Sequence, residues 1–175
     1  MRNRIVVATF LVVLSLTGCR SKQKVRIQAT EEEAPTLASM VHTADPRVST
    51  QLISGFYGIE DNAWRWTAGK FAVLLRPPRM AAQKGAILQL KFALPDPIIG
   101  PLKTVTIHAT VNGTALPSET YTKSGEYTYS HDVPPNVISG EAVKVEFAMD
   151  KALPPTGADQ RELGLVVSVV GFEPK

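Results

Sequence analysis

The sequence predicts an all-β protein in which residues 51–175 form a single antiparallel β-sandwich with a jelly-roll-like layout. Short segments of this part alternate apolar and polar residues with a period of two, which is typical of half-buried strands. Prolines, which cannot donate to a sheet ladder, separate these segments at positions 77 and 78, 95 and 97, 134 and 135, and 154 and 155. No stretch has the length and periodicity of an amphipathic helix, so little helix is expected. About 125 residues are enough to bury a two-sheet core without covalent cross-links.

The first 18 residues are typical of a cleaved signal peptide. Arg2 and Arg4 supply its basic start, and residues 5–16 form an apolar stretch that is too short to span a bilayer. The run Leu-Thr-Gly-Cys at 16–19 resembles the lipobox cut by the lipoprotein signal peptidase. We therefore expect Cys19 to carry a diacylglyceryl group and to become the first residue of the mature protein. The alternative is a leftover thiol in an ordinary signal peptide or anchor helix.

Cys19 is the only cysteine of the chain. The sequence therefore excludes an intramolecular disulfide framework and a multi-cysteine metal site. Removal of residues 1–18 deletes two arginines and no acid, so the formal net charge falls from +3 to +1. Because the mature chain is near neutral and its basic residues are dispersed, nucleic acid is not an expected partner.

Residues 19–50 are predicted to form the lipidated N-terminus and a flexible tether. Four basic residues follow the cysteine and are expected to face anionic headgroups: Arg20, Lys22, Lys24 and Arg26. The alternative is a basic stretch without membrane contact. Acids at 31–33 and mixed polar residues continue the tether, with a short helix over 31–42 as the alternative for part of it. The N-terminus predicts anchoring to a membrane of the bacterial cell envelope, the outer one in a diderm because Arg20 is not an aspartate.

Five segments are predicted to be strands of the sandwich. Nearly continuous apolar runs at 71–75 and 165–170 indicate central strands, covered on both faces or by a loop. Strict alternation predicts half-buried strands at 88–92, 105–111 and 143–149. Asn112 and Gly113 predict a two-residue hairpin turn, since both central positions of that turn need positive φ.

The segment around both tryptophans is the first candidate binding site. In a strand, Trp64 and Trp66 share one face and Arg65 takes the other. Flat indoles stack on the apolar C–H faces of sugar rings, and charged groups such as Arg65 and Glu60 bind hydroxyls, so the chemistry suits a glycan. The alternative is that one or both indoles fill the core while Arg65 pairs with Glu60 or Asp61 to fix the turn.

A second candidate lies before the last strand, where Asp159 and Arg161 occupy a loop rich in proline and glycine. These two side chains could recognise a polar ligand, or they could form an ion pair that orders the loop. Tyr127 and Tyr129 share a strand face and offer the same choice, between an extended aromatic surface and cross-strand packing.

Two motif clusters resemble a jelly-roll module found beside bacterial cell-surface polysaccharide glycosyltransferases, which also occurs alone in lipoproteins. The resemblance covers roughly residues 55–172. It rests on Gly55, Phe56, Tyr57, Glu60, Trp64, Arg65 and Trp66, and on Asp159, Arg161, Leu163 and Gly164. It implies a non-catalytic sandwich similar to carbohydrate-binding domains, with Glu60, Arg65 and Arg161 as signature polar positions.

The residues that could carry catalysis do not form a recognisable motif. The three histidines, His42, His108 and His131, have no metal-ligand spacing, and there is no nucleophile elbow or phosphate-binding glycine loop. We therefore expect no enzyme, no cofactor and no metal. The leading hypothesis is non-catalytic binding of a glycan or another envelope component. The rival is an assembly protein that docks another envelope protein through a sheet face or an edge strand.

Overall fold

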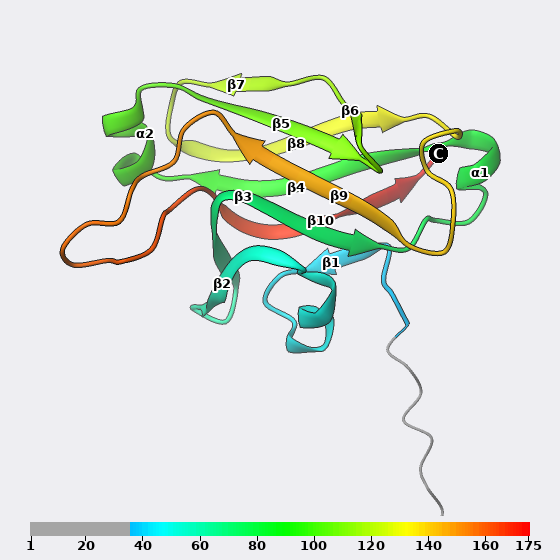
Figure 1. Cartoon of the computed structure of the whole chain (residues 1–175), viewed down its shortest axis with the longest axis horizontal. Coiled ribbons are helices and arrows are strands. Elements are labelled where there is room, and N and C mark those ends of the chain that lie inside the picture. The colour runs from blue at the N-terminus through cyan, green and yellow to red at the C-terminus, as the bar shows by residue number, and fades with distance from the viewer. Residues whose placement is uncertain (1–35) are drawn as a thin grey trace, which may run out of the picture. The chain divides into compact units, whose positions relative to one another are not determined.

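The computed structural model describes residues 36–175 and confirms the all-β prediction (Figure 1). The predicted signal peptide and Cys19 lie outside the described residues. The strands are β1 (Met40–His42), β2 (Ser54–Glu60), β3 (Trp64–Leu75), β4 (Ala86–Leu94), β5 (Val105–Val111), β6 (Thr114–Ala115), β7 (Glu119–Tyr121), β8 (Gly125–Val133), β9 (Val143–Met149) and β10 (Val166–Pro174). Three short helices accompany them: the 3₁₀ helix η1 (Pro46–Gln51), α1 (Ala81–Lys84) and α2 (Asp96–Leu102). No helix in residues 36–175 is long and apolar enough to cross a membrane.

All ladders are antiparallel and follow the order β6-β5-β9-β3-β10-β4-β8. The sheet curls into two layers because β3 serves both of them. Its first residues, Arg65 and Trp66, pair with β10, whereas residues 70–75 pair with β9. One layer therefore holds β8, β4, β10 and the short β1, and the other holds β5, β9, β3 and β2 (Figure 1).

The core fills the space between the two layers, and the alternating side chains enter it as the sequence predicts. In β5 and β9 every second residue from Val105 and from Val143 is buried. In β4 the same holds for residues 86, 88, 90, 92 and 94. Phe71 of β3 stacks on Phe147 of β9 with ring centroids 5.0 Å apart. The two apolar runs are interior strands, since β3 lies between β2 and β9 and β10 lies beside β4.

The predicted hairpin turn is also confirmed. Asn112 and Gly113 have φ values of +47° and +82° and join β5 to β6. The Asn112 side chain adds a contact that the turn alone does not require, because its amide donates to the Val137 carbonyl over 3.0 Å. The turn therefore also orders the loop before β9.

The folded domain begins earlier than residue 51, so the predicted tether is too long at its C-terminal end. Residues 40–42 pair with residues 169–171 of β10 as β1, and the Val41 side chain is 0% exposed. Gln51 is also buried and bonds to the backbone of Ala38 and Leu74. The alternative of a helix over 31–42 is wrong at residues 40–42, which are extended. A three-residue strand is too short to show a period of two, which is why the sequence pattern missed it.

Candidate functional site

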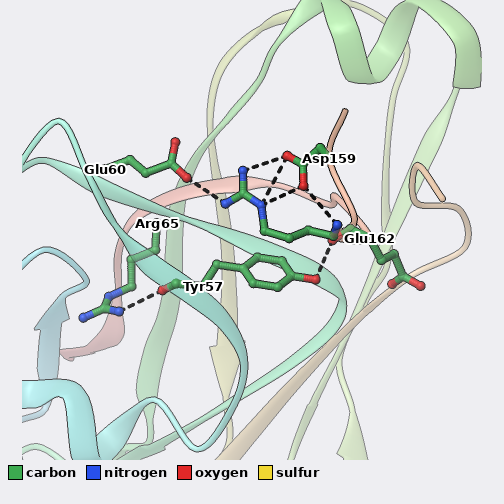
Figure 2. Close-up of polar contacts among 6 residues, drawn as sticks. Tyr57, Glu60, Arg65, Asp159 and Glu162 are labelled. Atoms are coloured by element: carbon green, nitrogen blue, oxygen red, sulfur yellow. Dashed lines mark hydrogen bonds and ion pairs between the residues drawn. The ribbon is translucent and has the colours of Figure 1, made fainter. Parts of the chain in front are cut away.

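The predicted site residues occupy three places in the fold. Glu60, Asp159 and Arg161 form one cluster of ion pairs. Arg65 points away from that cluster and binds backbone carbonyls (Figure 2). Trp64 and Trp66 lie on the opposite face of β3 from Arg65.

Arg161 is held by two acids from distant parts of the chain. Its Nη1 donates to Glu60 Oε1 over 2.7 Å, and its Nη2 donates to Asp159 Oδ2 over 2.8 Å. The guanidinium also lies over the Tyr57 ring, 5.3 Å from its centroid. Two carboxylates and an aromatic ring therefore surround this guanidinium. This favours the ion pair that orders the loop over recognition of a polar ligand.

Tyr57, a residue of the Gly-Phe-Tyr motif, and Glu162 complete this cluster. The Tyr57 hydroxyl donates to the Glu162 carbonyl over 2.8 Å (Figure 2), and the Gly69 N–H donates to Glu162 Oε1 over 2.6 Å. Together with the Glu60 contact, these bonds fasten the loop before β10 to β2 and to the middle of β3. Glu162 follows Arg161 directly, but its partner Gly69 is 93 residues away, and no local pattern indicates such a pair.

The cluster predicts an acid titration that depends on Arg161. Hydrogen bonds from the Arg161 side chain and N–H lower the pKa of Asp159 to about 2. A lowered pKa means that the bonds of Asp159 stabilise the fold above its ordinary value of 3.8, and that this contribution is lost as the pH falls through about 2. In the Arg161→Gln variant we expect the carboxyl carbon of Asp159, followed by NMR, to titrate at a higher pH than in the unchanged protein, but still below the ordinary value because the N–H of residue 161 keeps its bond.

Asp45 supplies the control within the same sample. Its pKa is also lowered to about 2, by hydrogen bonds from Arg47. Its titration should not move in the Arg161→Gln variant. If Asp159 kept its low midpoint in that variant, the guanidinium would not be the cause of the shift.

Arg65 holds three segments of the domain together. Its Nε donates to the Thr43 carbonyl over 2.7 Å, and its Nη1 donates to the Tyr57 carbonyl over 2.8 Å. Its Nη2 reaches the Ser49 hydroxyl of η1 over 3.1 Å. The expected pairing of Arg65 with Glu60 or Asp61 is wrong, because Glu60 bonds to Arg161 instead. Arg65 is thus a structural side chain that joins β2 and the segment around η1 to β3.

The two tryptophans differ in what they contact. Their rings meet edge to face, with centroids 6.0 Å apart. Both are half-buried, but Trp66 packs against the hydrophobic core, whereas Trp64 lines a concavity of about 440 Å³. Neither indole is fully buried, so neither is a complete core filler, and Trp64 is the one that lines the concavity.

The concavity lies on the face of one layer that points away from the core. Strands β3, β10, β4 and β8 supply its lining, which is Trp64, Lys91, Phe92, Ala93, Glu126, Tyr127, Thr128, Val166 and Ser168. Lys91 and Glu126 are exposed, and neither forms an ion pair within residues 36–175. An indole therefore stands beside a free ammonium, a free carboxylate and two hydroxyl groups. The sequence analysis found Trp64 but missed the other polar groups, because they come from three other strands.

Tyr127 and Tyr129 follow the packing alternative. Tyr129 is fully buried and its hydroxyl donates to the Pro117 carbonyl over 2.7 Å, while Tyr127 packs against Phe92 and Tyr121. Burial raises the pKa of the Tyr129 hydroxyl above its ordinary value. His131 Nε2 lies 2.7 Å from Glu119 Oε1, which joins β8 to β7. Tyr129 therefore belongs to the core, whereas Tyr127 packs on Phe92 and also lines the concavity with Trp64.

Within residues 36–175, no three His, Cys, Asp or Glu side chains are grouped so that they could hold a metal ion.

No family model matches the sequence, and no curated protein matches it. The fold is similar to that of solved structures. The CBM36-1 domain of a multidomain xylanase from the hindgut metagenome of Trinervitermes trinervoides is 12% identical, with a TM-score of 0.45 and coverage of 78% of this chain and 96% of that one. A family 35 carbohydrate-binding module from an environmental isolate is 10% identical, with a TM-score of 0.37 and coverage of 82% and 90%. An acetyl xylan esterase of Butyrivibrio proteoclasticus is 11% identical, with a TM-score of 0.44. The match covers 79% of this chain and 34% of that enzyme.

Proposed function

We propose that this protein is a lipoprotein of the bacterial cell envelope, anchored through lipid on Cys19, whose β-sandwich binds a glycan without catalysis. The binding site is the concavity at Trp64. The observation that carries the proposal is the position of this indole, outside the core cluster and in the wall of a hollow that also holds unpaired charges and hydroxyls.

The lining suits a sugar because it offers both kinds of contact that a sugar ring needs. The ring faces of a sugar are apolar C–H surfaces, which an indole covers well. Its edge carries hydroxyls, each of which can donate and accept a hydrogen bond. Glu126 accepts, Lys91 donates, the Thr128 hydroxyl does both, and the Ser168 hydroxyl, which donates to the Lys91 carbonyl over 3.3 Å, can accept. A hollow of about 440 Å³ has the size of a site for one or a few sugar rings.

Loss of the indole should abolish most of the binding. For the Trp64→Ala variant we expect at least about a 30-fold weaker affinity for the envelope polysaccharide that the unchanged protein binds, because a central aromatic anchor typically contributes 2 kcal/mol or more. The measurement is calorimetry with a panel of envelope polysaccharides. Trp66 is then the only indole, and its fluorescence reports whether the variant is folded.

The matched control is Ile53→Ala, which removes another exposed apolar side chain, 45% exposed, that does not line the concavity. This variant should bind as the unchanged protein does. If Trp64→Ala folded and bound every tested glycan unchanged, the site would be misassigned. If the unchanged protein bound none of them while Trp64 stayed open to acrylamide, the rival role in docking another envelope protein would take the place of the glycan proposal.

A further inference from the structure

A cationic and apolar surface lies at one end of the domain, between β3 and β4. It consists of Arg76, Arg79, Met80 and Lys84, all of which are exposed. Met80 is 56% exposed, more than Ile53 at 45%, the other exposed large apolar side chain of residues 36–175. We call these four residues the α1 surface, because they lie on α1 and on the loop that precedes it (Figure 1).

The charge of this surface is not neutralised by partners. Residues 63–95 contain six lysines and arginines and no acid. None of the three cations of the α1 surface takes part in an ion pair within residues 36–175. Three acids lie near it: Asp132, which is paired with Lys175 over 3.0 Å, Glu173, which is opposite residue 87 of β4, and Glu141, which precedes the strand that pairs with residue 75. The segment that follows β4, by contrast, contains an acid, Asp96, as well as a base, Lys103.

The backbone at Met80 displays its side chain outward. Met80 is the N-cap of α1 and has a φ of +65°, a conformation that non-glycine residues seldom adopt. Ala81 beside it is buried and fixes the start of the helix. An apolar side chain held at the tip of a turn and flanked by cations is suited to the boundary between lipid headgroups and acyl chains, where apolar groups insert and cations meet phosphates.

The position of this surface matches the place where the chain enters the domain. The Arg76 N–H donates to the Ala38 carbonyl over 3.1 Å, so the start of the described chain runs beside the α1 surface. Eighteen residues lie between Cys19 and Ala38. If they form the tether that the sequence predicts, their root-mean-square reach is about 24 Å. A lipid on Cys19 would therefore keep this end of the domain close to the bilayer.

We propose that the α1 surface docks on the anionic membrane that holds the lipid anchor, with Met80 inserted among the headgroups. The inference rests on the proposed lipidation of Cys19. Docking of this end leaves the rest of the sandwich, including the concavity at Trp64, to face other envelope components.

The test uses a single fluorescent probe in the lipidated chain. Because Cys19 is the only natural cysteine, Met80→Cys introduces the only thiol open to labelling once Cys19 carries lipid. The control is Gly100→Cys on α2, at the opposite end of β4, where a Cβ meets no atom within 4 Å. Both chains are labelled with an environment-sensitive dye and reconstituted into phosphatidylethanolamine vesicles with or without phosphatidylglycerol.

In the anionic vesicles, we expect the emission of the dye at position 80 to shift to the blue and to be quenched by lipid-borne quenchers. In vesicles without phosphatidylglycerol this dye should not change. The dye at position 100 should not change in either type of vesicle. Adding Arg79→Glu and Lys84→Glu should abolish the shift. The loss of each cation lowers the ratio of docked to undocked protein about fivefold. The loss of both therefore lowers it about 25-fold, before the repulsion of the two added acids is counted. The proposal is overturned if both positions respond alike, if anionic lipid has no effect, or if only a soluble acidic polysaccharide or another protein shifts the dye.

The mass of the N-terminal peptide reports the anchor separately. If Cys19 carries no lipid, the proposed anchor fails. The two dyes are then read in a Cys19→Ser chain with added vesicles. A blue shift at position 80 that depends on phosphatidylglycerol still supports the α1 surface, and its absence overturns it.

Discussion

Replacing Arg65 with alanine is expected to lower the free energy of unfolding by about 3 kcal/mol, because each hydrogen bond from a charged donor contributes roughly 1.5–3 kcal/mol and part of the loss is recovered by water. The guanidinium donates to two backbone carbonyls, of Thr43 and Tyr57, and to the Ser49 hydroxyl. Thr43 follows β1, which pairs with β10, and Tyr57 lies in β2, so the guanidinium links segments that no single ladder joins. The measurement is urea unfolding followed by fluorescence and by circular dichroism.

Arg47 provides the control for this change. It is also an arginine of the N-terminal part of the domain, but it bonds only to its neighbour Asp45, and its side chain is 88% exposed. An exposed ion pair of this kind contributes little to stability, so Arg47→Ala should leave the unfolding midpoint almost unchanged. Equal effects of the two variants would show that the contacts of Arg65 are not what holds the segment around η1 in place.

The contrast between these two arginines shows which part of the site could be predicted from the sequence. The period of two placed Trp64 and Trp66 on one face and Arg65 on the other, and the structure agrees, because a strand leaves no other choice. The partners could not be derived in this way. Glu60 pairs with Arg161, which is 101 residues distant, and the sequence offered the closer Arg65 as a wrong alternative.

The same distinction explains the rest of the fold. The strands at 88–92, 105–111 and 143–149 were predictable because burial on one face imposes an alternation that is visible locally. The order of strands depends on pairings across the whole chain, and so does the difference between Trp64 and Trp66. Trp66 packs on the core, while Trp64 lies where β4, β8 and β10 form a hollow. A sequence pattern indicates on which face of a strand a side chain lies, but it does not indicate which side chains of other strands lie next to it.

At Gly55 the backbone of β2 comes so close to β3 that a side chain does not fit. It opens the Gly-Phe-Tyr motif, has a φ of +72°, and lies at an irregularity in the pairing of β2 with β3. A Cβ at this position would overlap the Lys70 carbonyl oxygen and approach the Phe71 Cα to 2.7 Å. Both obstacles are backbone atoms of an interior strand, which cannot move aside as a flexible side chain could. The glycine of this motif is therefore explained by packing and needs no role in binding.

For the Gly55→Ala variant we expect the free energy of unfolding to fall by about 3–5 kcal/mol, the sum of the cost of positive φ for a residue with a Cβ and of the displacement of β2 from β3. Gly113→Ala is the matched control, since Gly113 has a φ of +82° but a Cβ there meets no atom within 4 Å. That variant should lose only about 1 kcal/mol, from the backbone alone. Because the two glycines share the sign of φ and differ in the space around them, the difference between the variants measures the contact of β2 with β3. A similar loss in both would place the whole effect in the backbone conformation and would contradict the close approach of the two strands.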